Sequence, residues 1–149
     1  MNDLNARIID EFRANEGRVG GSLSGTPMLL LHHIGARSGI ERVTPLACSP
    51  RPDGGIAIIA SNGGSPTHPA WYHNLKAHPG VTVEMGTETF VAEAAELDDA
   101  ARADLWPELV AEAPSAGTYQ SRTARQIPVF ILNRVPARTR APSAAWSGT

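Results

Sequence analysis

Cysteine, long apolar runs and runs of one charge are all scarce in this sequence, and each shortage excludes a class of protein. The single cysteine, Cys48, cannot form a disulfide within the chain, which favours a reducing, cytoplasmic location over a disulfide-stapled secreted fold. No apolar stretch approaches the roughly 20 residues that a membrane span needs, and the first residues lack the basic-then-apolar layout of a signal peptide. The 13 basic and 15 acidic residues give a net charge of −2 without a long basic run, so nucleic acid is not expected as the main partner.

The chain also lacks the short motifs of several enzyme classes. Its glycines form neither the G-x-G-x-x-G fingerprint of dinucleotide binding nor a phosphate loop ending in Gly-Lys-Ser/Thr. A G-x-S-x-G nucleophile elbow is missing as well, which argues against hydrolysis. His68, His73 and His78 are spaced five apart, whereas a zinc helix uses i and i+4 on one face. We therefore expect no metal site.

A length of 149 residues predicts one domain, preceded by a helix and followed by a tail. Residues 2–13 have apolar side chains at helical spacing, and such a helix usually packs on its own domain. Its polar face mixes acids with arginines, so at most peripheral membrane contact is expected. The predicted division is 1–25 for this helix and a glycine-rich connector, 26–134 for the domain, and 135–149 for a disordered tail rich in Pro, Ala, Ser and Arg.

Between these ends the pattern predicts a mainly β (α+β) chain of about six strands. Turn signals recur every eight to twelve residues or so, which favours a small barrel or sandwich over a doubly wound fold. His32 and His33 end the first strand, and because neighbouring strand residues point to opposite faces, only one of them can face a given pocket. Pro107 is expected to kink or divide a helix at 98–112, and 113–126 is expected to be irregular or a short helix. The predicted strands are 28–34, 42–49, 55–60, 81–85, 89–97 and 127–132, with a short central helix at 70–78.

The most informative stretch is 61–79, SNGGSPTHPAWYHNLKAHP, which follows an apolar strand. Two glycines let the backbone bend and approach a ligand closely, and Pro69 suits the start of a helix. A strand, a glycine loop and a helix N-terminus together offer free backbone donors to an anionic or carbonyl-bearing ligand. The alternative is a surface loop that only leads into a helix.

Three segments carry a resemblance to a known family: LLLHHIGARSGIERVTPLA, IIASNGGSPTHPAWYHNLKAHP and YQSRTARQIPVFIL. In this order and spacing they resemble the deazaflavin-dependent nitroreductase family, actinobacterial flavin/deazaflavin oxidoreductases that bind coenzyme F420. The resemblance covers about residues 29–132 and implies a split β-barrel with a deazaflavin-binding site in 26–134.

The resemblance assigns the coenzyme's anionic tail to Arg37, Ser38 and Arg42. The two arginines are five residues apart across a turn and could reach one anionic group from two sides, with charge-assisted hydrogen bonds of roughly 1.5–3 kcal/mol each. Two solvated arginines in a turn are the alternative interpretation.

The resemblance places the coenzyme ring over the strand–loop–helix junction, where backbone donors could stabilise negative charge on it. Trp71 is also interpreted as a core anchor, and Asn74 as a residue that could satisfy buried backbone groups. Relatives commonly have a lysine where this chain has Asn62. The implied ring contacts are Val43, Thr44, Pro45, Leu46, Ala47, Ile59, Ala60, Ser61, Asn62, Ala70, Trp71, Tyr72, His73 and Asn74.

The implied activity is hydride transfer from reduced F420 to a small organic acceptor such as a quinone, an enone or a nitro compound. A non-catalytic F420-binding or storage protein and an FMN-binding barrel are the alternatives, with FMN as second cofactor choice and a monomer or homodimer as the assembly. Tyrosines that line the acceptor pocket in nitroreductase members correspond to Ala113, Ala116 and Tyr119 here, which predicts a wider, less polar pocket unless this segment is mobile. Tyr119 and Ser61 are the candidate catalytic residues.

Overall fold

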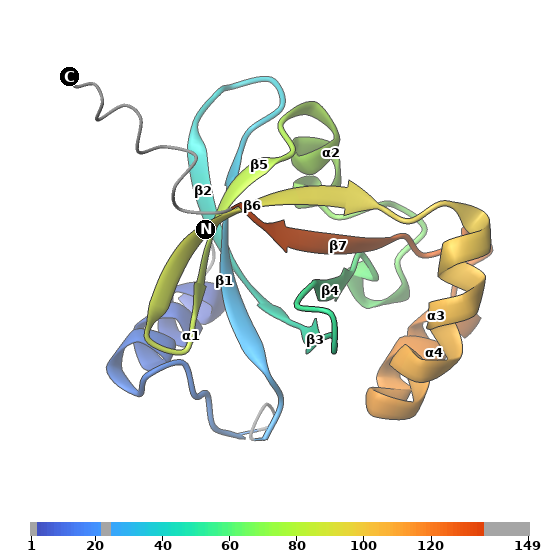
Figure 1. Ribbon diagram of the computed structural model, residues 1–149, viewed down its shortest axis with the longest axis horizontal. Helices are drawn as coiled ribbons and strands as arrows, with labels where there is room; N and C mark the ends of the chain where they lie inside the picture. The colour runs from blue at the N-terminus through green and yellow to red at the C-terminus, as the bar shows by residue number, and fades with distance from the viewer. Residues whose placement is uncertain (1–2, 22–24, 136–149) are drawn as a thin grey trace.

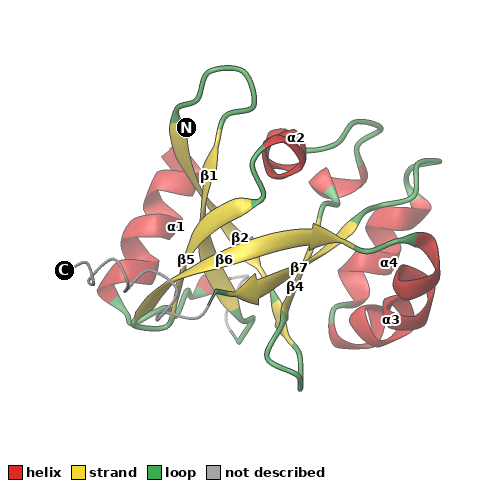
Figure 2. Ribbon diagram, turned by 45° about the horizontal axis from the view of Figure 1, so that its top comes forward, coloured by secondary structure: helices red, strands yellow, loops and turns green. Residues whose placement is uncertain are grey.

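The computed structural model describes residues 3–21 and 25–135, where strands form one curled antiparallel sheet with helices packed around it (Figure 1). Figure 2 shows α1 on one side of the sheet, α3 and α4 on the other, and α2 between them. The strands are β1 (Met28–Ile34), β2 (Glu41–Ala47), β3 (Ser49–Pro50), β4 (Ile56–Ile59), β5 (Gly80–Met85), β6 (Glu88–Glu96) and β7 (Val129–Arg134). The helices are α1 (Asp3–Ala14), α2 (Ala70–Ala77), α3 (Asp99–Glu112) and α4 (Pro114–Ser121), with a 3-10 turn at Asn62–Gly64.

The order of the strands explains why the sheet curls into a barrel. In the described residues the order is β2-β1-β5-β6-β7-β4-β3, so β2 and β3 are at opposite ends of the sheet. Only Cys48 separates these two strands in the chain, and its N–H donates to the carbonyl of Pro27 at 3.0 Å. The two ends of the sheet must therefore approach each other, which confirms the predicted split barrel. The strand predicted at 42–49 divides at Cys48, which gives seven strands in place of about six.

β1 is apolar on both faces because both faces are covered. Leu29 and Leu31 point into the barrel core, and Leu30 points to the cluster under α1. A third cluster lies between α3 and the outer face of β4 and β7, with Leu109 and Val129 buried in it. The continuous apolar pattern of this strand, which predicted burial on both sides, is confirmed.

α1 packs on its own domain, as its amphipathic pattern predicts. Ile9 and Phe12 are buried in one cluster with Leu30 of β1. Arg13 in the last turn donates to both carboxylate oxygens of Glu84 on β5, at 3.1 and 2.7 Å. The apolar face of the helix is therefore used within the fold. No helix in residues 3–21 and 25–135 is both long and apolar enough to cross a membrane.

The region after β6 contains the predicted helix, α3, and a short helix, α4, which was one of the two alternatives for 113–126. α3 begins where Asp98 Oδ1 accepts from the N–H of Ala101 at 2.8 Å, and it continues through Pro107 without being divided. Proline costs a helix one hydrogen bond, and Leu109, two residues further on, is buried in one cluster with Val129 of β7. Pro114 then occupies the first turn of α4, where a missing N–H is tolerated. The segment 136–149 of the predicted tail is outside the described residues.

Candidate functional site

The predicted tail site lies in the turn between β1 and β2, and its two arginines are available. The turn is closed by hydrogen bonds from Gly35 N–H to the Ile40 carbonyl (2.9 Å) and from Gly39 N–H to the Gly35 carbonyl (3.0 Å). Arg37 in the turn and Arg42 at the start of β2 are exposed. Neither forms an ion pair with a carboxylate among the described residues, in contrast to Arg13, Arg51 and Arg134.

Ser38 has a structural task in this turn. Its Oγ accepts a hydrogen bond from the N–H of Ile40 at 3.1 Å, and its hydroxyl hydrogen can still donate to a ligand. A Cβ at Gly35 would lie 2.4 Å from this Oγ, so a larger residue there would displace the Ser38 hydroxyl from its hydrogen bond. The motif Gly-Ala-Arg-Ser-Gly therefore specifies the shape of the turn as well as its charge.

Asn74 on α2 connects this turn to two strands. Its Oδ1 accepts from the N–H of Ala36 at 2.8 Å, and its Nδ2 donates to Nδ1 of His33 at 2.9 Å. Nδ1 of His33 is thus an acceptor, which places the ring proton on Nε2, where it donates to Oγ1 of Thr44 at 2.8 Å. Asn74 does satisfy a backbone group, although that group belongs to the exposed residue Ala36, and it also orients an imidazole.

The two adjacent histidines face opposite sides of the sheet, as predicted. His33 is buried toward α2, and burial, with the nearby charges of Arg42 and His32, lowers its pKa to about 4. His32 lies on the outer face, where its Nε2 is 2.5 Å from Oε2 of Glu84. Only the neutral His33 can therefore contribute to the site near α2.

The glycine loop after β4 is built from left-handed backbone. Asn62, Gly63 and Gly64 have φ values of 46°, 67° and 82°. A Cβ at Gly64 would lie 2.8 Å from the carbonyl oxygen of Tyr119, so glycine is required for the loop to pack against α4. The Asn62 side chain donates to the Thr67 carbonyl at 3.1 Å, and it thus bridges the loop.

Arg125 fixes this loop, and the sequence reasoning missed its role. Its guanidinium donates to the carbonyls of Ser61 (2.8 Å), Ser65 (2.9 Å) and Ala60 (3.3 Å), and to Nδ1 of His68 (3.0 Å). Burial lowers the pKa of His68, and the charge of Arg125 lowers it further. The only signal in the sequence is an arginine two residues before the predicted last strand at 127–132, which could equally have been a surface charge.

Arg125 is itself positioned by Gln120 of α4. The Gln120 Nε2 donates to the Arg125 carbonyl at 2.7 Å, while its Oε1 accepts from Arg102 (2.9 Å) and from the N–H of Ile127 (2.9 Å). Arg102 is buried, and its Nε donates to the Ile127 carbonyl at 2.7 Å. The loop is therefore braced by α3 and α4 together.

The predicted ring contacts on α2 divide into buried and accessible residues. Trp71 is 6% exposed and its ring centroid is 5.9 Å from that of Phe130, which agrees with a core anchor. Tyr72 is partly buried and stacks on His68 with ring centroids 4.0 Å apart. Ala70 and His73 are exposed.

The predicted strand residues do not all face the same side. Thr44 and Leu46 share the inner face of β2, whereas the side chain of Val43 packs under α1 and that of Ile59 packs under α3. Only backbone groups of Val43 and Ile59 are therefore suited to contact a ligand on the inner face.

β2 pairs with β1 alone in the described sheet, so its other edge is open. An open edge also explains how the strand tolerates Pro45. Ala47 is exposed and Ala60 is fully buried.

The predicted acceptor residues lie on or next to α4. Ala113 is exposed at the junction with α3, and Ala116 is 4% exposed, so its side chain faces the interior. Tyr119 is partly buried, with the Arg122 guanidinium 5.6 Å from its ring centroid. Its backbone contact with Gly64 brings α4 beside the loop that contains Ser61.

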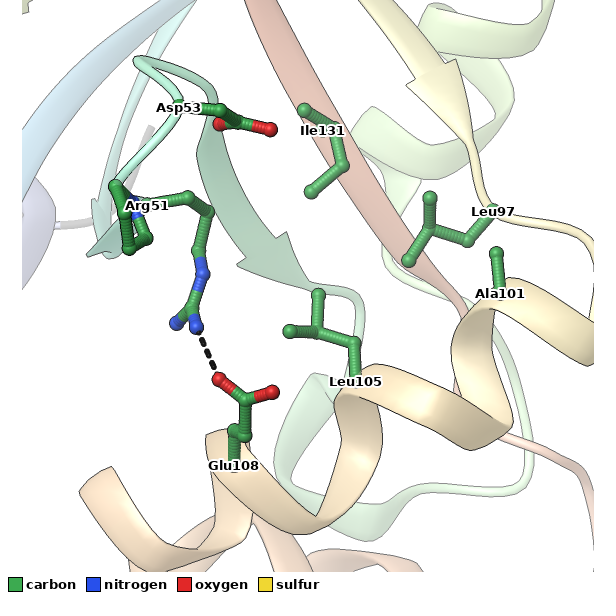
Figure 3. Close-up of a pocket in the computed structure, with 8 residues that line it drawn as sticks. Arg51, Asp53, Leu97, Ala101, Leu105, Glu108 and Ile131 are labelled. Atoms are coloured by element: carbon green, nitrogen blue, oxygen red, sulfur yellow. Dashed lines mark hydrogen bonds and ion pairs between the residues drawn. The ribbon is translucent and has the colours of Figure 1, made fainter.

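Two clefts lie elsewhere on the molecule. The first has a volume of about 450 Å³ and lies between α3 and the β3–β4 turn, with Leu97, Leu105 and Ile131 along its apolar side (Figure 3). Arg51 at its edge pairs with Glu108 at 2.7 Å. The second, of about 220 Å³, is next to His32. None of the predicted site residues lines either cleft. Within residues 3–21 and 25–135 no cluster of three or more His, Cys, Asp or Glu could hold a metal ion.

Comparison with known proteins identifies the family. A model of the F420H(2)-dependent quinone reductase family matches residues 6–134, which is most of the chain. The chain belongs to this family. It is 41% identical over 128 residues to an F420H(2)-dependent quinone reductase of Mycobacterium tuberculosis, and the match covers 83% of this chain and 85% of that protein.

Solved structures similar to this member of the F420H(2)-dependent quinone reductase family share its fold. One, of an F420-H2 dependent reductase (FDR-A), is 40% identical with a TM-score of 0.64 and covers 72% of this chain and 94% of its own. Another, described as a domain-swapped dimer, is 36% identical with a TM-score of 0.66 and covers 86% and 93% of the two chains. The resemblance to deazaflavin-dependent oxidoreductases and the predicted split barrel are both confirmed.

Proposed function

We propose that this protein binds coenzyme F420 and uses its reduced form to reduce quinones. The observation that supports this most directly is the pair of arginines, Arg37 and Arg42, exposed without carboxylate partners among the described residues, in a chain that belongs to a family named for F420H(2). The tail of F420 is a phosphodiester linked to glutamates and is therefore a polyanion. The guanidinium groups of Arg37 and Arg42, together with the hydroxyl of Ser38, suit such a ligand.

Within this proposal the tail is held by Arg37, Ser38 and Arg42. Guanidinium groups donate in a planar fork that suits phosphate and carboxylate oxygens. Because the turn is braced by Asn74, the arginine backbones start from a fixed position. Less conformational entropy is then lost on binding.

We propose that the ring is held by the open edge of β2 and by the loop after β4, where the resemblance places it. Backbone groups of β2 that do not pair with β1 are directed to this edge, and Ser61 and Asn62 belong to the loop after β4. His68, near the end of this loop, stacks on Tyr72 of α2. When bound, the reduced coenzyme supplies a hydride, which is its own chemistry.

Reduction of a quinone to a hydroquinone takes a hydride and one proton, so a group at the site has to guide that proton. We propose the hydroxyl of Tyr119, or failing it that of Ser61, for this role. Only Tyr119 remains of the three tyrosine positions at 113, 116 and 119, so the acceptor site is wide and less polar. Flat quinones are favoured over bicyclic nitroimidazoles, with enones and other nitro compounds as further acceptors.

A protein that only stores F420 is the second candidate, since the tail and ring contacts would serve it equally well. FMN finds no support as the cofactor, because the family and the solved relative FDR-A are named for F420. One relative is described as a domain-swapped dimer, and we propose a homodimer for this chain, which light scattering of the purified protein would test.

The experiment combines binding with turnover. Purified protein is titrated with F420, FMN and NADPH, and oxidation of reduced F420 is then followed with quinone, enone and nitroimidazole acceptors. We expect F420 to bind most tightly and quinones to be turned over fastest. Equal or tighter binding of FMN would refute the cofactor. Tight F420 binding without acceptor-dependent oxidation would favour the storage protein.

A further inference from the structure

Asn74 and His33 form a buried polar pair that takes no part in the proposed hydride and proton transfers. Asn74 is 7% exposed and His33 is 2% exposed, so neither residue offers much surface to a ligand. Every strong hydrogen-bonding group of the pair nevertheless has a partner: the Ala36 N–H, the other member of the pair, and Thr44 Oγ1. Buried networks of this kind specify one arrangement of the elements that they join.

The hydrogen bond from Ala36 to Asn74 connects the turn that contains Arg37 to α2. Ala36 directly precedes Arg37, and the other hydrogen bonds of the turn run between its own residues. Among the residues that the structure describes, no other hydrogen bond joins residues 35–40 to another element. Asn74 thus determines where the arginine backbone lies relative to α2.

We propose that Asn74, oriented by His33, is a positioning residue that fixes the tail-binding turn relative to the ring-binding end of α2. The protein would thereby select its coenzyme by the anionic tail together with the ring. This inference rests on the proposed function, because it requires that the turn binds the tail of F420 and that α2 binds its ring. Asn74 acts through Arg37 and contacts no reacting atom.

A purely structural role makes a different prediction. If Asn74 only stabilised the fold, its loss would weaken binding of the whole coenzyme and of its ring portion alike. If Asn74 positions the turn, its replacement weakens only the contacts made with the tail. The affinity for F420 then falls, whereas the affinity for the ring portion does not. The deazaflavin riboside, which has the ring and lacks the phosphodiester–glutamate tail, separates the two cases.

The test is a double-mutant cycle on binding. Dissociation constants of F420 and of the riboside are measured for wild type, Asn74→Ala, Arg37→Ala and the double variant. We expect Asn74→Ala to weaken F420 binding about tenfold and to leave riboside binding within about twofold. In the Arg37→Ala background the same substitution should cause almost no further loss, because residues that act through one contact are not additive.

Controls separate loss of positioning from loss of stability. Leu75→Val changes the next buried residue of α2 without touching the turn. It should lower the unfolding midpoint while leaving both affinities within about twofold. Should Asn74→Ala fail to fold, His33→Gln carries the same cycle, since it removes the imidazole that orients Asn74. Asn133→Ala, at an exposed asparagine, is the neutral reference.

The outcomes are distinct. Equal losses for F420 and riboside, additive losses in the cycle, or an Arg37→Ala variant that binds F420 like wild type would each overturn the inference while leaving F420 binding established. A wild-type protein that does not bind F420 would refute the proposed function, and the inference with it.

Discussion

Replacing Arg125 should loosen the glycine loop that follows β4. Arg125→Met keeps the aliphatic stem and removes the guanidinium, which leaves three backbone carbonyls and the Nδ1 of His68 without their donor. Hydrogen bonds from a charged donor contribute about 1.5–3 kcal/mol each. Arg125 is only partly buried, so water can replace a good part of them. We expect a loss of about 2–4 kcal/mol in the free energy of unfolding.

Urea unfolding at constant m-value measures this loss, and hydrogen exchange locates it. The amides of residues 61–68 should exchange faster in Arg125→Met, whereas those of β1 and β5 should lose protection only in step with the global stability. His68→Ala removes one of the four acceptors and should have a smaller effect. A variant within about 0.5 kcal/mol of wild type, with unchanged exchange in the loop, would show that Arg125 does not hold it.

Three further predictions concern the tail site, the acceptor and pH. Arg37→Ala and Arg42→Ala should each weaken F420 binding by about 1–3 kcal/mol and make it less salt-sensitive, with stability nearly unchanged. If the double variant binds F420 with wild-type affinity, the two arginines are ordinary surface charges that do not bind the tail. Tyr119→Phe should slow steady-state quinone reduction, and an unchanged rate would remove that hydroxyl from the mechanism. His33 has a folded pKa of about 4 against 6.5 in the unfolded chain. Unfolding therefore takes up a proton between these values, and stability should be full above about pH 6.5 and fall by up to about 3 kcal/mol toward pH 4. Urea unfolding across this range should lose that slope in His33→Gln, and a slope that persists would assign it to another group.

The elements with strong local patterns could be predicted closely from the sequence. β1 was expected at 28–34 and is found there, because a strand covered on both faces reads as one apolar run. The central helix was expected at 70–78 and ends one residue earlier, since Pro69 and Pro79 bracket it. In both cases neighbouring residues alone determine the outcome.

Features that depend on distant partners could not be predicted in this way. The division of the second strand at Cys48 depends on a hydrogen bond to Pro27, and the continuity of α3 through Pro107 depends on what its buried face contacts. Arg125 is 60 or more residues from the carbonyls that it holds. A pattern of apolar residues contains no information about such pairings.

The candidate site shows the same distinction between the residues that face a ligand and those that support them. The family motifs indicate Arg37 and Arg42 because their charge is displayed in the sequence itself. Asn74 could be interpreted as a partner of buried backbone, but its connection to His33 needs three elements to be assembled.

The acceptor side follows from this assembly. From the sequence, residues 113–126 could have been a mobile segment that covers nothing. α4 instead contacts Gly64 closely enough to require glycine there, and its Gln120 braces Arg125, which in turn holds the carbonyl of Ser61. Tyr119 directly precedes Gln120 in α4, and the carbonyl of Ser61 accepts from Arg125, so the segments that contain the two candidate proton-guiding residues are joined through Gln120 and Arg125. A change at Gln120 should therefore alter acceptor turnover even though, among the described residues, its side chain bonds only Arg102 of α3 and the backbone of Arg125 and Ile127.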